Sequence, residues 1–223
     1  MKSQTTNLAS DHPSEFELRD IAPGLWIWRV KRPRWRPGQG WDPIVASTCV
    51  ESRGEVLLLD PLAPPIEAHQ FWQRLDAHPP TAIVVLKPDH VRDVDLFARR
   101  YHSQAFGPRV FFREDIPQTN LQPIDPGTEL PGGLLALYDG RGRNETPLWL
   151  PDHRTIVFAD ALTAPRGKLL VWTTPWHEER VLPALRKMLA FPLERVIVSH
   201  GEPVHTPAEF EFALQRPPWT GSI

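Results

Sequence analysis

Ionisable side chains directly follow five of the apolar runs that the sequence predicts to be strands. In layered α/β folds, ligands collect beyond the carboxyl ends of strands, where loops from different strands meet. Aspartate and histidine at such ends bind metal ions or transfer protons, and arginine holds anions. We therefore expect one polar site built from loops far apart in the chain. Its candidate residues are His90, Arg92, Asp93, Arg141, Asp160 and His200.

The composition restricts what such a site can contain. The chain has 223 residues, with nine histidines and one cysteine. Because Cys49 is the single thiol, an internal disulfide and a metal site built on several cysteines are both excluded. Any metal would have to be bound by histidine, aspartate or glutamate. The formal net charge of -2 argues against a dedicated nucleic-acid binder, for which a basic excess is expected.

The length fits a polar N-terminal extension, residues 1–20, followed by a single domain, residues 21–223. The first residues are polar and include no apolar stretch of signal-peptide length. The longest aliphatic runs are far too short to span a bilayer. We therefore expect a cytoplasmic location and no membrane partner.

Short apolar runs alternate with amphipathic segments along the chain, a pattern typical of a layered α/β domain with mixed sheets. We expect strands at residues 25–30, 44–50, 56–59, 83–86, 110–112, 134–138, 148–150, 155–158, 169–172 and 196–199. We expect helices at residues 64–78, 91–101, 177–190 and 207–214. Asp60, in the turn after a strand, is interpreted as a structural hydrogen-bonding residue.

Several segments follow one another in the order of a known set of motifs. Asp60 ends a strand before a helix, and Leu148–Pro151 forms a hairpin strand. Phe158–Leu162 (Phe-Ala-Asp-Ala-Leu) and Ser199–Pro203 (Ser-His-Gly-Glu-Pro) follow later strands. This order resembles the metallo-β-lactamase superfamily over residues 24–204, where the last two motifs are Gly-Asp-Ala-Leu and Gly-His-Gly. The resemblance implies an α/β (α+β) fold, a four-layer αββα sandwich with mixed sheets.

The main metal motif of that superfamily, His-x-His-x-Asp-His, is degraded in this sequence. Aligning the apolar strand before it puts Pro88 at the first histidine and His90 at the second. Arg92 then falls at the aspartate and Asp93 at the third histidine. Arg141 lies nearest to the histidine of a later loop. The resemblance thus implies fewer metal ligands than a two-metal centre needs.

Our first hypothesis is that Arg92 and Arg141 replace the metal. A guanidinium keeps its proton and cannot bind a metal, but it pairs well with carboxylates. We predict that one of the two lies within ion-pairing distance of Asp160. The protein would then be a divergent member of the fold that has lost the two-metal hydrolytic centre and carries no cofactor. Its groove would bind a partner or a small ligand, anionic if the arginines contact it.

The alternative is an active hydrolase with one zinc, manganese or iron ion, held by His90, Asp93, Asp160 and His200. The metal would activate water, and one of the two arginines would stabilise the developing oxyanion. The resemblance implies an ester, thioester, lactone or phosphoester substrate. A further alternative is acid–base chemistry by His90 and Asp93 without a metal.

The segment Lys31–Trp41 (KRPRWRPGQGW) contains four basic residues and two tryptophans. In the superfamily the corresponding hairpin loop overhangs the active-site groove. The resemblance therefore implies contacts to an anionic or aromatic ligand through charge and stacking, and the alternative is a solvated hairpin. We expect no nucleic-acid partner, and the many tryptophans are compatible with a homodimer.

Overall fold

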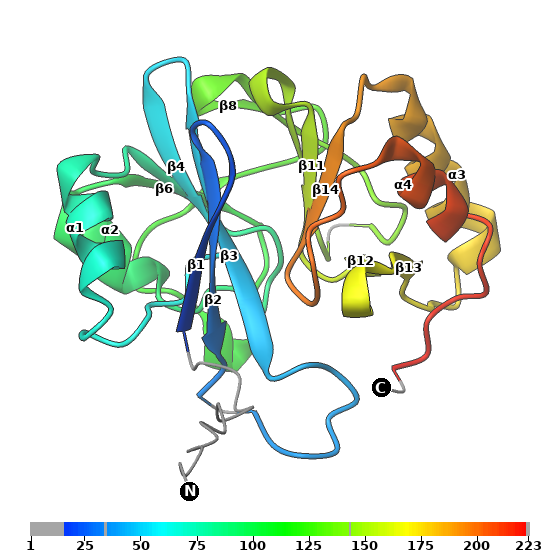
Figure 1. Ribbon diagram of the computed structural model, residues 1–223, viewed down its shortest axis with the longest axis horizontal. Helices are drawn as coiled ribbons and strands as arrows, with labels where there is room; N and C mark the ends of the chain where they lie inside the picture. Colours follow the sequence, from blue (N-terminus) through cyan, green and yellow to red (C-terminus); the bar gives the residue numbers. More distant parts are fainter. Residues whose placement is uncertain (1–15, 34, 143, 222–223) are drawn as a thin grey trace, which may run out of the picture.

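The computed structural model describes residues 16–33, 35–142 and 144–221, and its strands form two main sheets (Figure 1). The first sheet has the order β1 (Phe16–Ala22), β2 (Leu25–Lys31), β3 (Ile44–Ser52), β4 (Glu55–Leu59), β5 (Ala82–Val84), β6 (Gln104–Gly107) and β7 (Gln122–Pro123). The second has the order β14 (Arg195–Val198), β11 (Thr155–Phe158), β10 (Leu148–Leu150), β9 (Leu134–Ala136) and β8 (Glu129–Leu130). A small antiparallel pair, β12 (Leu162–Thr163) and β13 (Leu170–Val171), lies beside the second sheet.

Helices cover the outer face of each sheet, so the domain has four layers (Figure 1). They are α1 (His69–Ala77), α2 (Val94–Tyr101), α3 (Leu182–Lys187) and α4 (Pro207–Ala213). Phe71 and Phe97 of α1 and α2 are buried against the first sheet, and Phe210 of α4 is buried against the second. Val50 and Val157 belong to a third core between the two sheets. The expected αββα sandwich with mixed sheets is confirmed.

The sheets contain two parallel strand pairs that position the candidate site. Strand β4 pairs with β5 and strand β11 pairs with β14, each in parallel register. The carboxyl ends of parallel neighbours lie at the same edge of a sheet, so the loops that follow them converge. The N–H of Ala46 in β3 donates to the carbonyl oxygen of Ser199 at 2.8 Å and joins the two sheets at this end.

Three expectations about elements need correction. Residues 110–112 do not form a strand, and Val110 and Phe112 are 71% and 54% exposed because no neighbouring strand covers them. Strand β1 begins at Phe16, so the boundary expected between residues 20 and 21 falls inside a strand that pairs with β2. The helix expected at residues 177–190 consists of a π-helical turn, α3 and a 3₁₀ turn in succession.

The other expected strands, at residues 25–30, 44–50, 56–59, 83–86, 134–138, 148–150, 155–158, 169–172 and 196–199, are present with ends shifted by a few residues. Two helices begin a few residues later than expected: α1 begins at His69 and α2 at Val94. Helix α4 begins at Pro207, as expected. Within the described residues, none of the helices is both long and apolar enough to cross a lipid bilayer.

Candidate functional site

The centre of the site is an ammonium group held between two carboxylates. Lys87 Nζ lies 2.6 Å from Asp160 Oδ2 and 2.8 Å from Asp89 Oδ2. Burial alone would lower the pKa of Lys87, but the charges of Asp160 and Asp89 outweigh it and raise the pKa above its ordinary value. Lys87 is therefore a permanent cation at the point where the loops after β5 and β11 meet.

His90 connects this centre to the end of β4. Its Nδ1 lies 2.7 Å from Asp60 Oδ2, and its Nε2 lies 3.3 Å from Asp160 Oδ2. Burial disfavours the charged imidazole, but the carboxylates of Asp160 and Asp60 overcome this and raise the pKa of His90 to about 9. At neutral pH the ring is protonated and donates to both carboxylates. Asp60 thus has a direct role in orienting His90, beyond the structural turn expected for it.

His200 approaches Asp160 from the neighbouring strand β14 of the same sheet, and its pKa is shifted in the opposite direction to that of His90. Its Nε2 lies 3.5 Å from Asp160 Oδ1, and its ring contacts Trp41 edge-on with centroids 5.2 Å apart. Burial is the largest effect and lowers the pKa of His200 to about 4. The ring is therefore neutral at neutral pH. The pKa of Asp160 itself is lowered well below its ordinary value, because His90, Lys87 and His200 outweigh the effect of burial.

Arg92 and Asp93 lie close to His90 in sequence, but their side chains form hydrogen bonds with main-chain groups. The Arg92 guanidinium donates to the carbonyl oxygens of Ala46 and Asp60, at 3.1 and 2.7 Å. Asp93 Oδ2 accepts the N–H of Ala63 at 2.7 Å. Asp93 does not belong to the group of possible metal donors formed by Asp89, His90 and Asp160, and its role as a ligand stays a prediction. Arg92 has φ = 46°, a left-handed conformation, and none of its hydrogen bonds among the described residues is to Asp160.

Arg141 does not pair with Asp160 either, contrary to the expectation. It forms ion pairs with Asp139, at 2.7 Å, and with Glu145, and both carboxylates are fully buried. Glu145 in turn accepts hydrogen bonds of 2.8–2.9 Å from three consecutive backbone N–H groups, residues 159–161. The group Asp139, Arg141 and Glu145 thus fixes the turn that carries Asp160.

One group of possible metal donors remains. Asp89, His90 and Asp160 each offer one ligand atom, and these atoms lie within 4.8 Å of one another. In the part of the chain that the structure describes, no other group of three or more histidine, cysteine, aspartate or glutamate side chains meets that condition. Asp89 was not expected in this set, and His200 stands outside it. Sequence reasoning also missed Lys87, although it directly follows a buried strand end.

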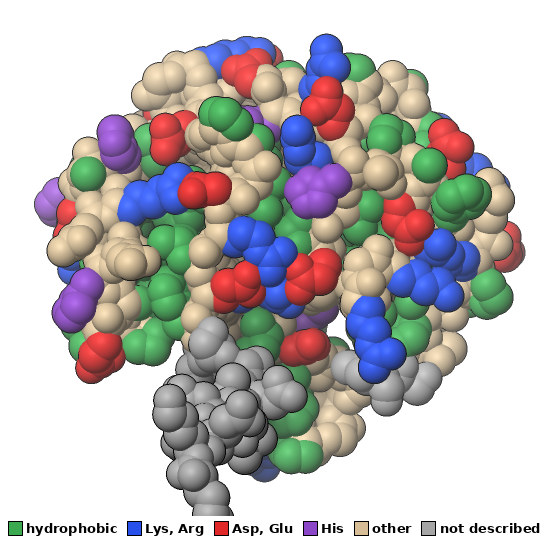
Figure 2. Space-filling view, in the orientation of Figure 1, with side chains coloured by type: hydrophobic (Ala, Val, Ile, Leu, Met, Phe, Trp, Pro, Cys, Tyr) green, Lys and Arg blue, Asp and Glu red, His purple; other side chains and the backbone are tan. Residues whose placement is uncertain are grey.

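A cavity of about 310 Å³ opens next to Lys87. It is lined by Arg32, Trp41, Lys87, Asp89, Arg141, Asp160, Trp172, Thr173 and His200. Of the loop Lys31–Trp41, Arg34 lies outside the described residues, while Arg32 stacks over Trp41 with its guanidinium carbon 5.3 Å from the ring centroid. Acidic and basic side chains lie side by side at the middle of one face of the molecule (Figure 2).

Gly201, directly after His200, is expected to tolerate no side chain. Its φ is +114°, and a Cβ there would lie 2.2 Å from the carbonyl oxygen of Ala164. Replacement of Gly201 by alanine should therefore lower the free energy of unfolding by about 3 kcal/mol, through backbone strain and a clash with main chain. Urea denaturation followed by circular dichroism measures the change.

Gly127 provides the matched control, because its φ is +90° and a Cβ there would meet nothing within 4 Å. Replacement of Gly127 by alanine should cost about 1 kcal/mol from the left-handed backbone alone. Equal losses in the two variants would contradict the close packing of the His200 turn against Ala164.

Solved structures with the same architecture come from several bacteria. The metallo-β-lactamase FIM-1 from Pseudomonas aeruginosa, in its mono-zinc form, is 17% identical with a TM-score of 0.66, covering 90% of this chain and 93% of its own. A metallo-β-lactamase from Erythrobacter litoralis is 16% identical with a TM-score of 0.66, covering 92% and 96%. One from Pontibacter korlensis is 15% identical with a TM-score of 0.63, covering 91% and 100%.

The chain has the metallo-β-lactamase fold. At the level of sequence it matches no protein-family model and no curated protein. The solved structures are 15–17% identical to this chain, and at that level the similarity shows a shared fold but not a shared function. Within the metallo-β-lactamase fold, the chemistry of this chain depends on its own residues around Asp160.

Proposed function

We propose that this protein is a metallo-β-lactamase-fold protein in which Lys87 takes the place of a metal ion and whose groove binds a small negatively charged molecule. The observation that carries the proposal is the position of Lys87 Nζ, 2.6 Å from Asp160 and 2.8 Å from Asp89. A metal ion bound by these two carboxylates would need the space and the charge that the ammonium supplies.

The charges around Asp160 support the same conclusion. With His90 protonated, Lys87 and His90 form ion pairs with the carboxylates of Asp60, Asp89 and Asp160. Arg92 forms no ion pair with them but interacts with Asp60 and Asp160 through its charge, so the formal charges of the six side chains cancel. The six side chains are Asp60, Asp89, Asp160, Lys87, His90 and Arg92. A dication is stabilised by donors with an excess of negative charge and by neutral imidazole. Two-metal centres also need more donors than this group of three supplies, so the residues do not fit such a centre.

The cavity beside Lys87 supports an anionic ligand. The basic side chains Arg32, Lys87 and Arg141 line it, against the two acidic side chains Asp89 and Asp160. Both acidic groups already interact with Lys87, and Arg32 has no carboxylate partner among the described residues. A ligand with a negative charge would therefore find an unpaired guanidinium above the groove. This extends the expectation that the arginine-rich loop contacts the ligand.

Metal analysis of untagged protein, purified without chelator, tests the proposal. We expect well below one equivalent of zinc, manganese or iron in the wild-type protein. Lys87→Ala should then gain zinc binding, since it uncovers Asp89, His90 and Asp160, whereas Lys87→Arg should stay metal-free because it keeps a cation in place. Near-stoichiometric metal in the wild type that is lost in His200→Ala or Asp160→Asn would overturn the proposal.

One observation favours a second candidate, a hydrolase with a single metal ion. Asp89 Oδ1 and Asp160 Oδ1 are buried and have no hydrogen-bond partner among the described residues, and buried polar atoms are usually satisfied. An ion bound by Asp89, His90 and Asp160 would require Lys87 to move out of the site and His90 to lose its proton. The same metal analysis distinguishes the two candidates.

A further inference from the structure

A second cavity, of about 290 Å³, continues from the first on the far side of His200. Trp41, Trp172 and His200 line both cavities, so the two form one groove. The walls of the second cavity come from five segments of the chain. They are β2 with Arg29, the end of the Lys31–Trp41 loop, the β12–β13 segment, the turn after β14 with His200, and the C-terminal tail with Trp219. Its size suits a molecule of one or two rings.

The C-terminal tail is a fixed wall of this cavity. The Trp219 N–H donates to the carbonyl oxygen of Val171 at 2.7 Å, and the Trp219 carbonyl oxygen accepts the N–H of Thr173 at 2.8 Å. Gly221 packs against the loop so closely that a Cβ on Gly40 would lie 2.6 Å from its carbonyl oxygen. The tail therefore connects β13 to the Lys31–Trp41 loop and closes the groove.

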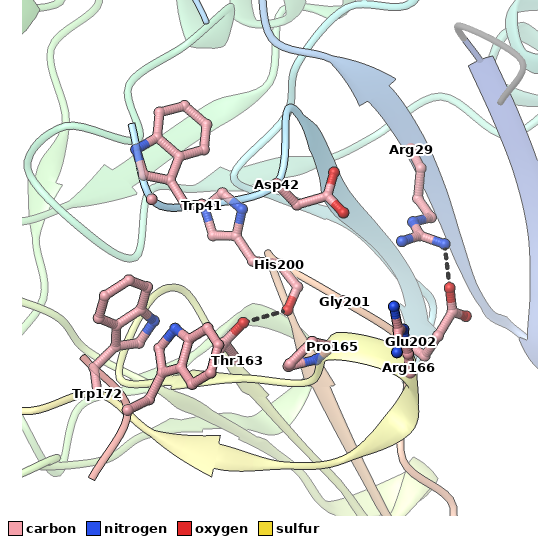
Figure 3. Close-up of a pocket in the computed structure, with 12 residues that line it drawn as sticks. Arg29, Trp41, Asp42, Thr163, Pro165, Arg166, Trp172, His200, Gly201 and Glu202 are labelled. Carbon is pink, nitrogen blue, oxygen red and sulfur yellow. Dashed lines mark hydrogen bonds and ion pairs between the residues drawn. The ribbon is translucent and has the colours of Figure 1, made fainter. Parts of the chain in front are cut away.

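The two ends of the cavity differ in chemistry. Trp41 and Trp172 stand at one end, and Arg29, Arg166 and Glu202 stand at the other (Figure 3). The Trp172 and Trp219 rings meet edge-on, with centroids 6.4 Å apart, and give the first end further aromatic surface. Flat aromatic rings bind such indole surfaces well.

At the charged end of the cavity, the guanidinium of Arg166 is unpaired among the described residues. Glu202 is already paired with Arg29, as well as with Arg19 of β1. Arg166 has no hydrogen-bond or ion-pair partner in the described part of the chain, and it is held at this end by a left-handed backbone with φ = 53°. A single free guanidinium matches a single negative charge on a ligand.

Unpaired polar atoms also gather around the groove. Of the seven buried side-chain atoms without a hydrogen-bond partner among the described residues, five belong to residues that line the two cavities. They are Arg29 Nε, Asp89 Oδ1, Asp160 Oδ1, Trp172 Nε1 and His200 Nδ1. The other two are in Trp26 and His177. The three nitrogen atoms, of Arg29, Trp172 and His200, belong to residues that line the second cavity, and a ligand with acceptor oxygens could supply partners for N–H groups there.

We infer that the groove takes a planar aromatic carboxylate, whose ring lies against the indoles and whose carboxylate pairs with Arg166. The inference rests on the proposed function, since it names the class of the small anion that the groove binds. It also makes Trp219, in the C-terminal tail, a specificity-determining residue. The ring would face Trp41, Trp172 and Trp219, in line with the aromatic ligand implied by the loop sequence.

Isothermal titration calorimetry with untagged protein and 2-naphthoate as the probe tests the inference. We expect saturable binding with a Kd below about 1 mM. The neutral analogue 2-naphthamide and the saturated analogue decahydro-2-naphthoate should each bind at least about tenfold more weakly, because one lacks the charge and the other lacks the flat ring. Decahydro-2-naphthoate binding as tightly as 2-naphthoate would overturn the aromatic part of the inference, and equal binding of 2-naphthamide would overturn the ionic part.

Matched variants locate the site. Trp219→Leu and Arg166→Gln should weaken 2-naphthoate binding by about tenfold, as expected for residues in the core of a binding site. Trp176→Leu and Arg186→Gln, which replace exposed residues that line neither cavity, should leave the Kd unchanged. Thermal unfolding confirms that each variant is folded. No saturable heat with 2-naphthoate, or unchanged binding in Trp219→Leu, would overturn the inference.

These outcomes are separable from those of the metal analysis. A metal-free protein that fails to bind 2-naphthoate would keep the proposed role of Lys87 and remove the aromatic ligand. A protein with one equivalent of metal that binds 2-naphthoate through Trp219 and Arg166 would remove the proposed role of Lys87 and keep the aromatic ligand.

Discussion

Replacement of Glu145 by glutamine is expected to lower the free energy of unfolding by about 4 kcal/mol, the cost of breaking a buried charge pair. The side chain is fully buried, accepts the N–H groups of residues 159–161 and pairs with Arg141. A glutamine amide offers one oxygen, and its NH₂ group would face groups that are themselves donors. Arg141 would then retain only Asp139. Urea denaturation followed by circular dichroism measures the loss.

Glu209 offers a matched control on the surface. It accepts the N–H of Leu169 at 2.9 Å and pairs with Arg216, so its contacts are of the same kind, but its side chain is 19% exposed. Glu209→Gln should cost about 1 kcal/mol, because water replaces part of what is lost. A loss below about 1 kcal/mol in Glu145→Gln, or equal losses in the two variants, would show that Glu145 does not hold the Asp160 turn.

The architecture followed from the sequence because the core strands are continuous apolar runs with clear ends. Strands β10 and β11 occupy the residues expected for them, since both are buried on their two faces. Strand β1 was missed because it has no fully buried residue, and polar residues alternate along it. Residues 110–112 are as apolar as a strand, so the local sequence predicts one there. In the structure β6 pairs with β7, which lies later in the chain, and the local sequence does not indicate this pairing.

In the site, residues that directly end strands were placed well, and residues within one loop were not. Asp160 and His200 come together because β11 and β14 are parallel neighbours. The roles of Arg92 and Asp93 depend on the left-handed turn at Arg92, which no sequence pattern in the loop specifies. Lys87 reaches a carboxylate 73 positions away, and this contact exists only once both sheets are packed.

The joint contribution of His90 and His200 to the free energy of unfolding is expected to be greatest near pH 6.5 and to fall on both sides, by about 3 kcal/mol toward pH 9 and by a similar amount toward pH 4. His90 binds its proton more tightly in the folded protein, with a pKa of about 9 against 6.5. Its stabilisation is complete below pH 6.5 and is lost as the pH rises through 9. Equilibrium urea denaturation at half-unit steps from pH 4.5 to 9 measures the curve.

His200 produces the acid side of that curve. Its pKa is about 4 in the folded protein against 6.5 ordinarily, so below pH 6.5 the unfolded chain binds the proton first and stability declines. His90→Gln should therefore flatten the alkaline limb alone, and His200→Gln the acid limb alone, while His69→Gln, at an exposed position, should leave both limbs intact. An alkaline limb that persists in His90→Gln would mean that His90 is neutral at pH 7. The Asp60–His90–Asp160 contacts would then be those of an uncharged ring, and the charge balance that makes a metal unnecessary would no longer hold.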